Sequence, residues 1–145
     1  RSILGNPIDP NVRELINSKV KFREMWRPFC PSTTEESGNK FFNYEGLLPF
    51  MIVACEVKKE YADQIPSTVH YDNTVRVQTV SKKTNPKFHK LITEFKKITG
   101  LPIILNTSFN IKGEAIVCSP EDAINSFFKT GMDYLAIGNY LVPQI

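Results

Sequence analysis

The chain has 145 residues, 41% of them apolar and 11% aromatic, and carries a formal net charge of +3. This length fits one domain, residues 1–145, and the apolar content excludes an intrinsically disordered chain. Apolar runs such as residues 50–55 are far shorter than the ~20 residues that a membrane-spanning helix needs. Because the three cysteines form no CxxC pair and no signal peptide opens the chain, we expect a reduced, cytoplasmic protein.

Apolar periodicity and turn residues predict the elements of the chain. In chain order, they are a helix at residues 11–19, a flexible polar loop at 33–46 that Phe41 and Phe42 can anchor, strands at 50–57 and 75–80, a helix at 86–99, strands at 101–105 and 115–117, a helix at 120–130 and a strand at 134–137. The order of the elements at 75–80, 86–99 and 101–105 predicts a parallel βαβ crossover. Interleaved strands and helices indicate an α/β or α+β sheet protein.

The last two predicted helices have clear end signals. Asn85 is a good N-cap for the helix at residues 86–99, Pro86 suits its first position, and Gly100 ends it. Ser119 and Pro120 play the same parts for the helix at residues 120–130.

A basic segment at residues 19–28 is the first candidate for chemistry. If it is extended, Lys21, Arg23 and Arg27 share one face, and such a row suits phosphate oxygens. The alternative is a solvated edge strand whose lysines prevent aggregation.

Two further polar segments accompany apolar strands. Arg76 lies in an alternating strand with Gln78 on the same face, so it is either solvated or paired with an anion. Residues 106–110 follow a strand that we expect to belong to a parallel sheet, where ligands bind at strand ends. The alternative for this segment is an ordinary turn.

A metal site at His70 and Asp72 has little support, and no metal ligand is predicted.

The sequence contains no P-loop, no GxGxxG and no GxSxG motif. The candidate residues therefore indicate a cationic cleft for phosphate without an evident nucleophile. Such a cleft favours phosphoanhydride chemistry, in which positioning and charge neutralisation do most of the catalysis.

Several motifs, in the same order, resemble one family over essentially the whole chain. They are R-S-I-L at residues 1–4, V-K-F-R-E at 20–24, W-R-P-F at 26–29, H-Y-D-N-T-V-R-V-Q-T-V at 70–80, L-N-T-S-F-N at 105–110, G-E at 113–114 and P-E-D-A at 120–123. This set resembles the C-terminal domain of the NodU/CmcH/TobZ carbamoyltransferases.

The resemblance implies a fold and an activity. The expected fold is YrdC/Sua5-like: an open twisted mixed α/β sheet with flanking helices around a basic concave surface. The expected activity uses carbamoyl phosphate, ATP and Mg²⁺ to make carbamoyl adenylate. A covalently linked N-terminal ASKHA-like domain, expected to lie outside this chain and to hold the family's iron, then transfers the carbamoyl group to a hydroxyl acceptor.

The resemblance also assigns roles to particular residues. The expected ATP-binding residues are the K-x-R and S-x-N pairs: Lys21, Arg23, Ser108 and Asn110. The residues expected to hold carbamoyl phosphate are Arg27, Arg76 and Asn106. The expected catalytic residues are Lys21, Arg23 and Arg76.

Two other functions remain open from the sequence. Residues 81–100 contain six lysines and one glutamate, which is typical of a solvated helix face but also allows an RNA-binding module. A docking domain without catalytic activity is the other alternative. The family supplies a further phosphate-binding arginine just before the match to Arg1, so the chain alone is expected to bind ligands rather than to turn over.

Overall fold

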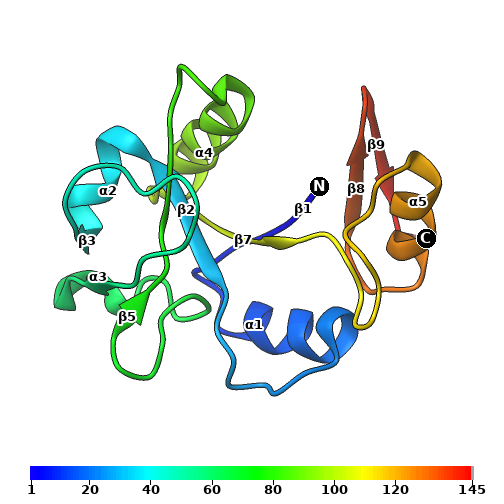
Figure 1. Ribbon diagram of the computed structural model, residues 1–145, viewed down its shortest axis with the longest axis horizontal. Coiled ribbons are helices and arrows are strands. Elements are labelled where there is room, and N and C mark those ends of the chain that lie inside the picture. Colours follow the sequence, from blue (N-terminus) through cyan, green and yellow to red (C-terminus); the bar gives the residue numbers. More distant parts are fainter. Residues whose placement is uncertain (145) are drawn as a thin grey trace.

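The computed structural model describes residues 1–144, in which a mixed four-stranded sheet lies at the centre (Figure 1). Its strands follow the order β1 (Ser2–Gly5), β7 (Ile103–Ser108), β2 (Cys30–Thr34) and β6 (Gln78–Val80). β7 runs antiparallel to both β1 and β2, whereas β2 and β6 are parallel. No helix in residues 1–144 is long and apolar enough to span a membrane.

Two smaller sheets complete the described strands. One sheet pairs β3 (Phe42–Asn43), β4 (Cys55–Val57) and β5 (Thr74–Val75), and the other is the hairpin of β8 (Tyr134–Ile137) and β9 (Tyr140–Pro143). In Figure 1 the hairpin lies beside α5 at one side of the central sheet, and the three-stranded sheet lies at the other. The open sheets with flanking helices confirm the predicted fold class and are consistent with a YrdC-like fold.

The helices differ widely in length. They are α1 (Asn11–Ile16), α2 (Glu35–Phe41), α3 (Lys59–Ala62), α4 (Pro86–Thr99) and α5 (Pro120–Phe128). A π-helical segment, Asn17–Lys21, continues α1 and ends at Phe22, whose φ of 44° lies in the left-handed region. A bulky residue adopts this conformation only where its surroundings enforce it, and here it turns the chain sharply after Lys21.

The end signals of the last two helices are confirmed. The Asn85 side chain accepts a hydrogen bond from the Phe88 amide, and Gly100 closes α4 with a φ of 80°. At α5, the Ser119 hydroxyl accepts from the Asp122 amide, and the Asp122 carboxylate accepts from the Ser119 amide. These two bonds form a capping box, and Pro120 is the first residue of the helix.

Replacing Ser119 with alanine is expected to lower the free energy of unfolding by about 1 kcal/mol, because the first turn of α5 loses the acceptor for the Asp122 amide. Chemical denaturation measures this change. Ser81→Ala is a useful control, because within residues 1–144 the Ser81 hydroxyl caps no helix end and accepts only from the Lys83 amide. An equal loss in both variants would contradict the prediction.

Three strand predictions are wrong. Residues 50–54 form no strand, because the chain turns through Met51 at a φ of 56° and leaves Phe50 and Ile52 exposed; only Cys55–Val57 pairs. Residues 115–117 have no strand partner. The alternating strand at 75–80 breaks at Arg76 and Val77 into β5 and β6, which belong to different sheets.

The predicted flexible loop and the predicted crossover are also wrong. Residues 33–46 form the end of β2, then α2 and β3, and they are held by Phe41 and Phe42, both buried. β6 and β7 do not form a parallel βαβ unit, because β2 lies between them and runs parallel to one and antiparallel to the other.

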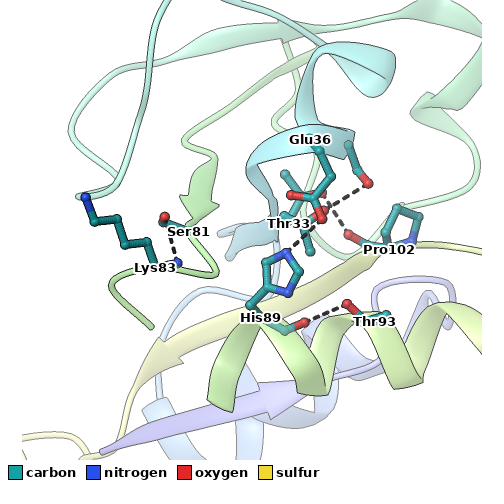
Figure 2. Close-up of polar contacts among 9 residues, drawn as sticks. Thr33, Glu36, Ser81, Lys83, His89, Thr93 and Pro102 are labelled. Atoms are coloured by element: carbon teal, nitrogen blue, oxygen red, sulfur yellow. Dashed lines mark hydrogen bonds and ion pairs between the residues drawn. The ribbon is translucent and has the colours of Figure 1, made fainter. Parts of the chain in front are cut away.

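A polar contact joins α4 to α2 (Figure 2). His89 Nε2 lies 2.7 Å from Glu36 Oε1, and the Thr93 hydroxyl donates to the His89 carbonyl over 2.9 Å. Nearby, the Thr33 hydroxyl donates to the Pro102 carbonyl over 2.8 Å. The His89–Glu36 contact links α4 to α2, whereas the Thr93 contact lies within α4 and the Thr33 contact links β2 to the residue before β7.

The position of α4 leaves part of the sheet open. Val80 and Ile104 share a buried cluster with Ile92 of α4. Since side chains two residues apart share a face of a strand, Gln78 and Asn106 continue this same face beyond the helix. The uncovered end of the face carries the polar side chains of the candidate site.

Candidate phosphate-binding site

Three strands of the central sheet bring polar side chains to this open end. Cys30 of β2 is paired with Asn106 of β7, and Ser32 of β2 is paired with Gln78 of β6. Asn106 and Ser108 lie within β7, which is antiparallel to both neighbours, so the predicted loop after a parallel strand is wrong. The site is instead formed along one sheet face, beyond the part that α4 covers.

Lys21 connects the two predicted ATP-binding pairs. Its Nζ donates to the carbonyl and hydroxyl oxygens of Ser108 at 2.7 and 3.3 Å. It also donates to the carbonyl and Oδ1 of Asn110 at 3.0 and 2.8 Å. Because an ammonium has three protons, these four acceptors occupy all of its donor capacity. Lys21 therefore holds residues 108–110 in place rather than projecting freely.

Arg23 is fixed by its own surroundings. Its Nε donates to Oδ1 of the buried Asn17 over 2.7 Å, and its guanidinium carbon lies 4.5 Å from the centre of the Phe29 ring. Asn17 in turn donates to the carbonyls of Met25 and Arg27. The predicted extended row of Lys21, Arg23 and Arg27 is wrong, since residues 22–28 form turns without a strand.

The chain nevertheless gathers the predicted cations. Burial lowers the pKa of Arg23 most, and repulsion from Arg27 and Arg76 lowers it further. Arg76 also lies against Cys30: burial raises the pKa of this thiol, and the guanidinium opposes that rise. Arg76 is itself exposed. Arginines from two distant segments thus lie close enough to repel one another.

Few carboxylates balance this charge. Among the ion pairs of residues 1–144, the one that involves these cations joins Arg27 to Glu24 at 3.7 Å, and both side chains are 55% exposed. Exposed pairs of this kind contribute little to stability. The remaining positive charge is stabilised best by an anion that contacts several of the cations at once.

A polar network adjoins the cations. Asn106 Nδ2 donates to Ser32 Oγ and to Gln78 Oε1, each over 3.1 Å. The Ser32 hydroxyl donates to Gln78 Oε1 over 2.8 Å, and Gln78 Nε2 donates to the Pro49 carbonyl over 3.1 Å. We call Ser32, Gln78 and Asn106 the amide network. Asn106 is the strand partner of Cys30, and Arg76 lies near Cys30, so this carboxamide lies close to the cations.

Sequence reasoning missed three members of the site. Asn17 lies in a segment that predicts a helix and nothing more, and Ser32 lies outside every predicted element, so neither gives a signal. Gln78 shares a predicted strand face with Arg76 but carries no predicted role. Its alternation with Arg76 was the signal that could have found it.

A cavity of about 770 Å³ lies elsewhere, between β1, α1, α5 and β8. Its lining includes Ile3, Leu15, Phe127 and Leu135, and it contains none of the residues predicted for ATP or carbamoyl phosphate. Mostly apolar walls suit no phosphate, so the cationic face remains the candidate site.

Anion binding should weaken at alkaline pH. Burial, together with repulsion from Arg23, lowers the pKa of Lys21 to about 8, and a bound anion favours the charged form and raises this pKa again. The dissociation constant for sulfate, which keeps its charge throughout this range, is therefore expected to rise above pH 8 by up to about tenfold per pH unit. Titration calorimetry between pH 7 and 9.5 measures it. The same pH dependence in Lys21→Arg would contradict the assignment to Lys21.

Cations and a carboxamide on one face of a mixed sheet define an α/β protein with a candidate anion site. The chain belongs to the family described as carbamoyltransferase C-terminus, whose model matches residues 1–144. This match confirms the resemblance to the NodU-type carbamoyltransferases.

Similar proteins come from bacteria and archaea. The chain is 46% identical to nodulation protein NolO of Bradyrhizobium diazoefficiens over 99% of its own length and 27% of that protein. It is also 46% identical to an uncharacterised protein of Methanocaldococcus jannaschii, over 99% of the chain and 24% of that protein. Nodulation protein U of Rhizobium tropici is 35% identical over 78% of the chain and 20% of its own length. The chain thus spans about a quarter of the length of these curated relatives.

Proposed function

We propose that this chain is the domain of an O-carbamoyltransferase that forms carbamoyl adenylate from carbamoyl phosphate and ATP. The observation that carries the proposal is that Arg23, Arg27 and Arg76 lie close enough to repel one another, and that Arg76 lies near Cys30, the strand partner of Asn106. Membership of the carbamoyltransferase family supports the transfer of a carbamoyl group. The cationic surface and the family resemblance support the use of ATP.

The proposed reaction has two displacements. Water attacks carbamoyl phosphate, the bond to phosphate breaks, and carbamate and inorganic phosphate form. A carbamate oxygen then attacks the α-phosphorus of ATP, and the bond to pyrophosphate breaks to leave carbamoyl adenylate. In both steps negative charge develops on the departing phosphate or pyrophosphate. Guanidinium groups that are already fixed in place stabilise this charge without reorganising.

Each side chain has a role that its contacts allow. Arg76 and Arg27 bind the phosphate of carbamoyl phosphate, and Asn106 binds the carbamoyl group. Arg23, fixed by Asn17 and Phe29, neutralises the phosphates of ATP. Lys21 holds Ser108 and Asn110 against the nucleotide. Mg²⁺ fits as an ion carried by the phosphates of ATP, because residues 1–144 contain no group of three or more His, Cys, Asp or Glu side chains placed to hold it.

Exchange of labelled pyrophosphate into ATP tests the proposal in the protein that carries this chain. Exchange that requires carbamoyl phosphate is expected, since carbamoyl adenylate is the species that pyrophosphate attacks in the reverse direction. Absence of exchange, or exchange that is unchanged when carbamoyl phosphate is omitted, would refute adenylate formation.

A further inference from the structure

The hydrogen bonds of the amide network fix the orientation of its two carboxamides. The Pro49 carbonyl can only accept a hydrogen bond, so the Gln78 carboxamide must turn its Nε2 toward Pro49. Its Oε1 then faces Ser32 and Asn106. Because this oxygen can only accept, Asn106 must turn its own Nδ2 toward Gln78. One backbone carbonyl thereby determines the orientation of two side-chain amides.

This orientation leaves one atom of Asn106 available. The Asn106 side chain is 8% exposed, and none of its hydrogen bonds within residues 1–144 uses Oδ1. Every fully buried side-chain nitrogen or oxygen in that range has a partner. Oδ1 is therefore the atom of Asn106 that reaches the surface, where it can accept a hydrogen bond but cannot donate one.

We infer that Gln78 is a positioning residue that makes the site select an acyl phosphate with an amino group. The inference rests on the proposed function and names its specificity. An acceptor oxygen beside the cations binds the NH₂ of carbamoyl phosphate but offers nothing to the methyl group of acetyl phosphate. A site built to bond such a polar group rejects the analogue that lacks it, because the bound analogue covers the acceptor and leaves it without a partner.

Removing the amide of Gln78 should weaken this selection. In Gln78→Met, the side chain no longer offers Oε1 to Asn106, and the Asn106 carboxamide is free to turn over and present Nδ2. The ratio of kcat/KM for carbamoyl phosphate to that for acetyl phosphate, measured by pyrophosphate exchange in the intact protein, is expected to fall by about 10- to 100-fold. A merely structural defect would lower both values and leave the ratio unchanged.

Gln64→Met is the matched control. Gln64 is exposed and donates to the Glu60 carbonyl within its own turn, so the same substitution there should preserve the ratio. A folded Gln78→Met protein that keeps the wild-type ratio would overturn the inference while leaving adenylate formation intact. Wild-type protein without carbamoyl-phosphate-dependent exchange would overturn both.

A spectroscopic measurement tests the orientation without any activity. In the wild type, the two Asn106 Nδ2 protons donate to Ser32 and Gln78, so their chemical shifts should depend weakly on temperature. In Gln78→Met this dependence is expected to become that of a solvated amide. A solvated amide already in the wild type would refute the fixed orientation and with it the selectivity argument.

Discussion

Replacing Arg76 with alanine is expected to lower kcat/KM for carbamoyl phosphate by about 10²- to 10³-fold, the usual effect of removing one donor that stabilises developing charge. Arg76 is exposed and takes part in none of the ion pairs of residues 1–144. Its loss should therefore leave the fold intact, while the repulsion that it exerts on Arg23 disappears. Carbamoyl-phosphate-dependent pyrophosphate exchange measures the effect.

Two comparisons make the Arg76 experiment decisive. Arg76→Lys keeps the charge but loses the two-pronged donor, so it should recover only part of the activity. Lys83→Ala removes an exposed cation at the approach to α4 and should change kcat/KM by less than about twofold. If Arg76→Ala and Lys83→Ala behaved alike, Arg76 would have no role beyond general surface charge.

Replacing Lys21 with methionine is expected to lower the exchange activity by about 10²-fold. The variant keeps an unbranched side chain of similar length but loses all four contacts to Ser108 and Asn110. These two residues then lose the anchor that orients them. The free energy of unfolding should fall by only about 1–2 kcal/mol, because the removal of a buried charge offsets part of the lost hydrogen bonding.

Lys96→Met is the control for this variant. Lys96 is exposed on α4 and makes no side-chain hydrogen bond within residues 1–144, so both activity and stability should stay near wild type. Activity in Lys21→Met within about twofold of the wild type would show that residues 108–110 need no anchor.

Local sequence signals predicted the helices well. The Asn85 and Ser119 caps act within one turn of the chain, so α4 and α5 begin where the sequence places them. Local sequence signals did not predict where the strands break. Residues 50–54 are as apolar as a buried strand, yet the turn at Met51 exposes them, and nothing in the pattern distinguishes the two outcomes.

In the candidate site too, the sequence predicted which residues take part but not how the chain arranges them. Motifs that resemble a known family identified Lys21, Arg23 and Ser108, and the structure brings Lys21 and Ser108 into contact. Their geometry could not be predicted from an extended segment, because the left-handed Phe22 and the π-helical turn decide where Lys21 points. Asn17, six residues before Arg23, contacts it only through that turn.

The six lysines of residues 81–100 are exposed along α4 and the loop before it. This agrees with the interpretation of a solvated helix face. Lys97 is paired with Glu94 on the surface of the same helix at 2.8 Å. An RNA-binding role remains a separate hypothesis, to which a steep fall of RNA affinity with added salt would give support.

The residues of the candidate site lie in two kinds of backbone, a paired strand and a segment of turns. Asn106 lies in β7, whose amides pair with strands on both sides, whereas Arg23 and Arg27 lie in turns that follow Phe22. Deuterium should therefore enter residues 22–28 quickly and β7 slowly. A phosphate ligand that contacts both parts would slow labelling in residues 22–28 and leave β7 unchanged, so mass spectrometry of labelled peptides can report occupancy of the arginines without any catalytic assay.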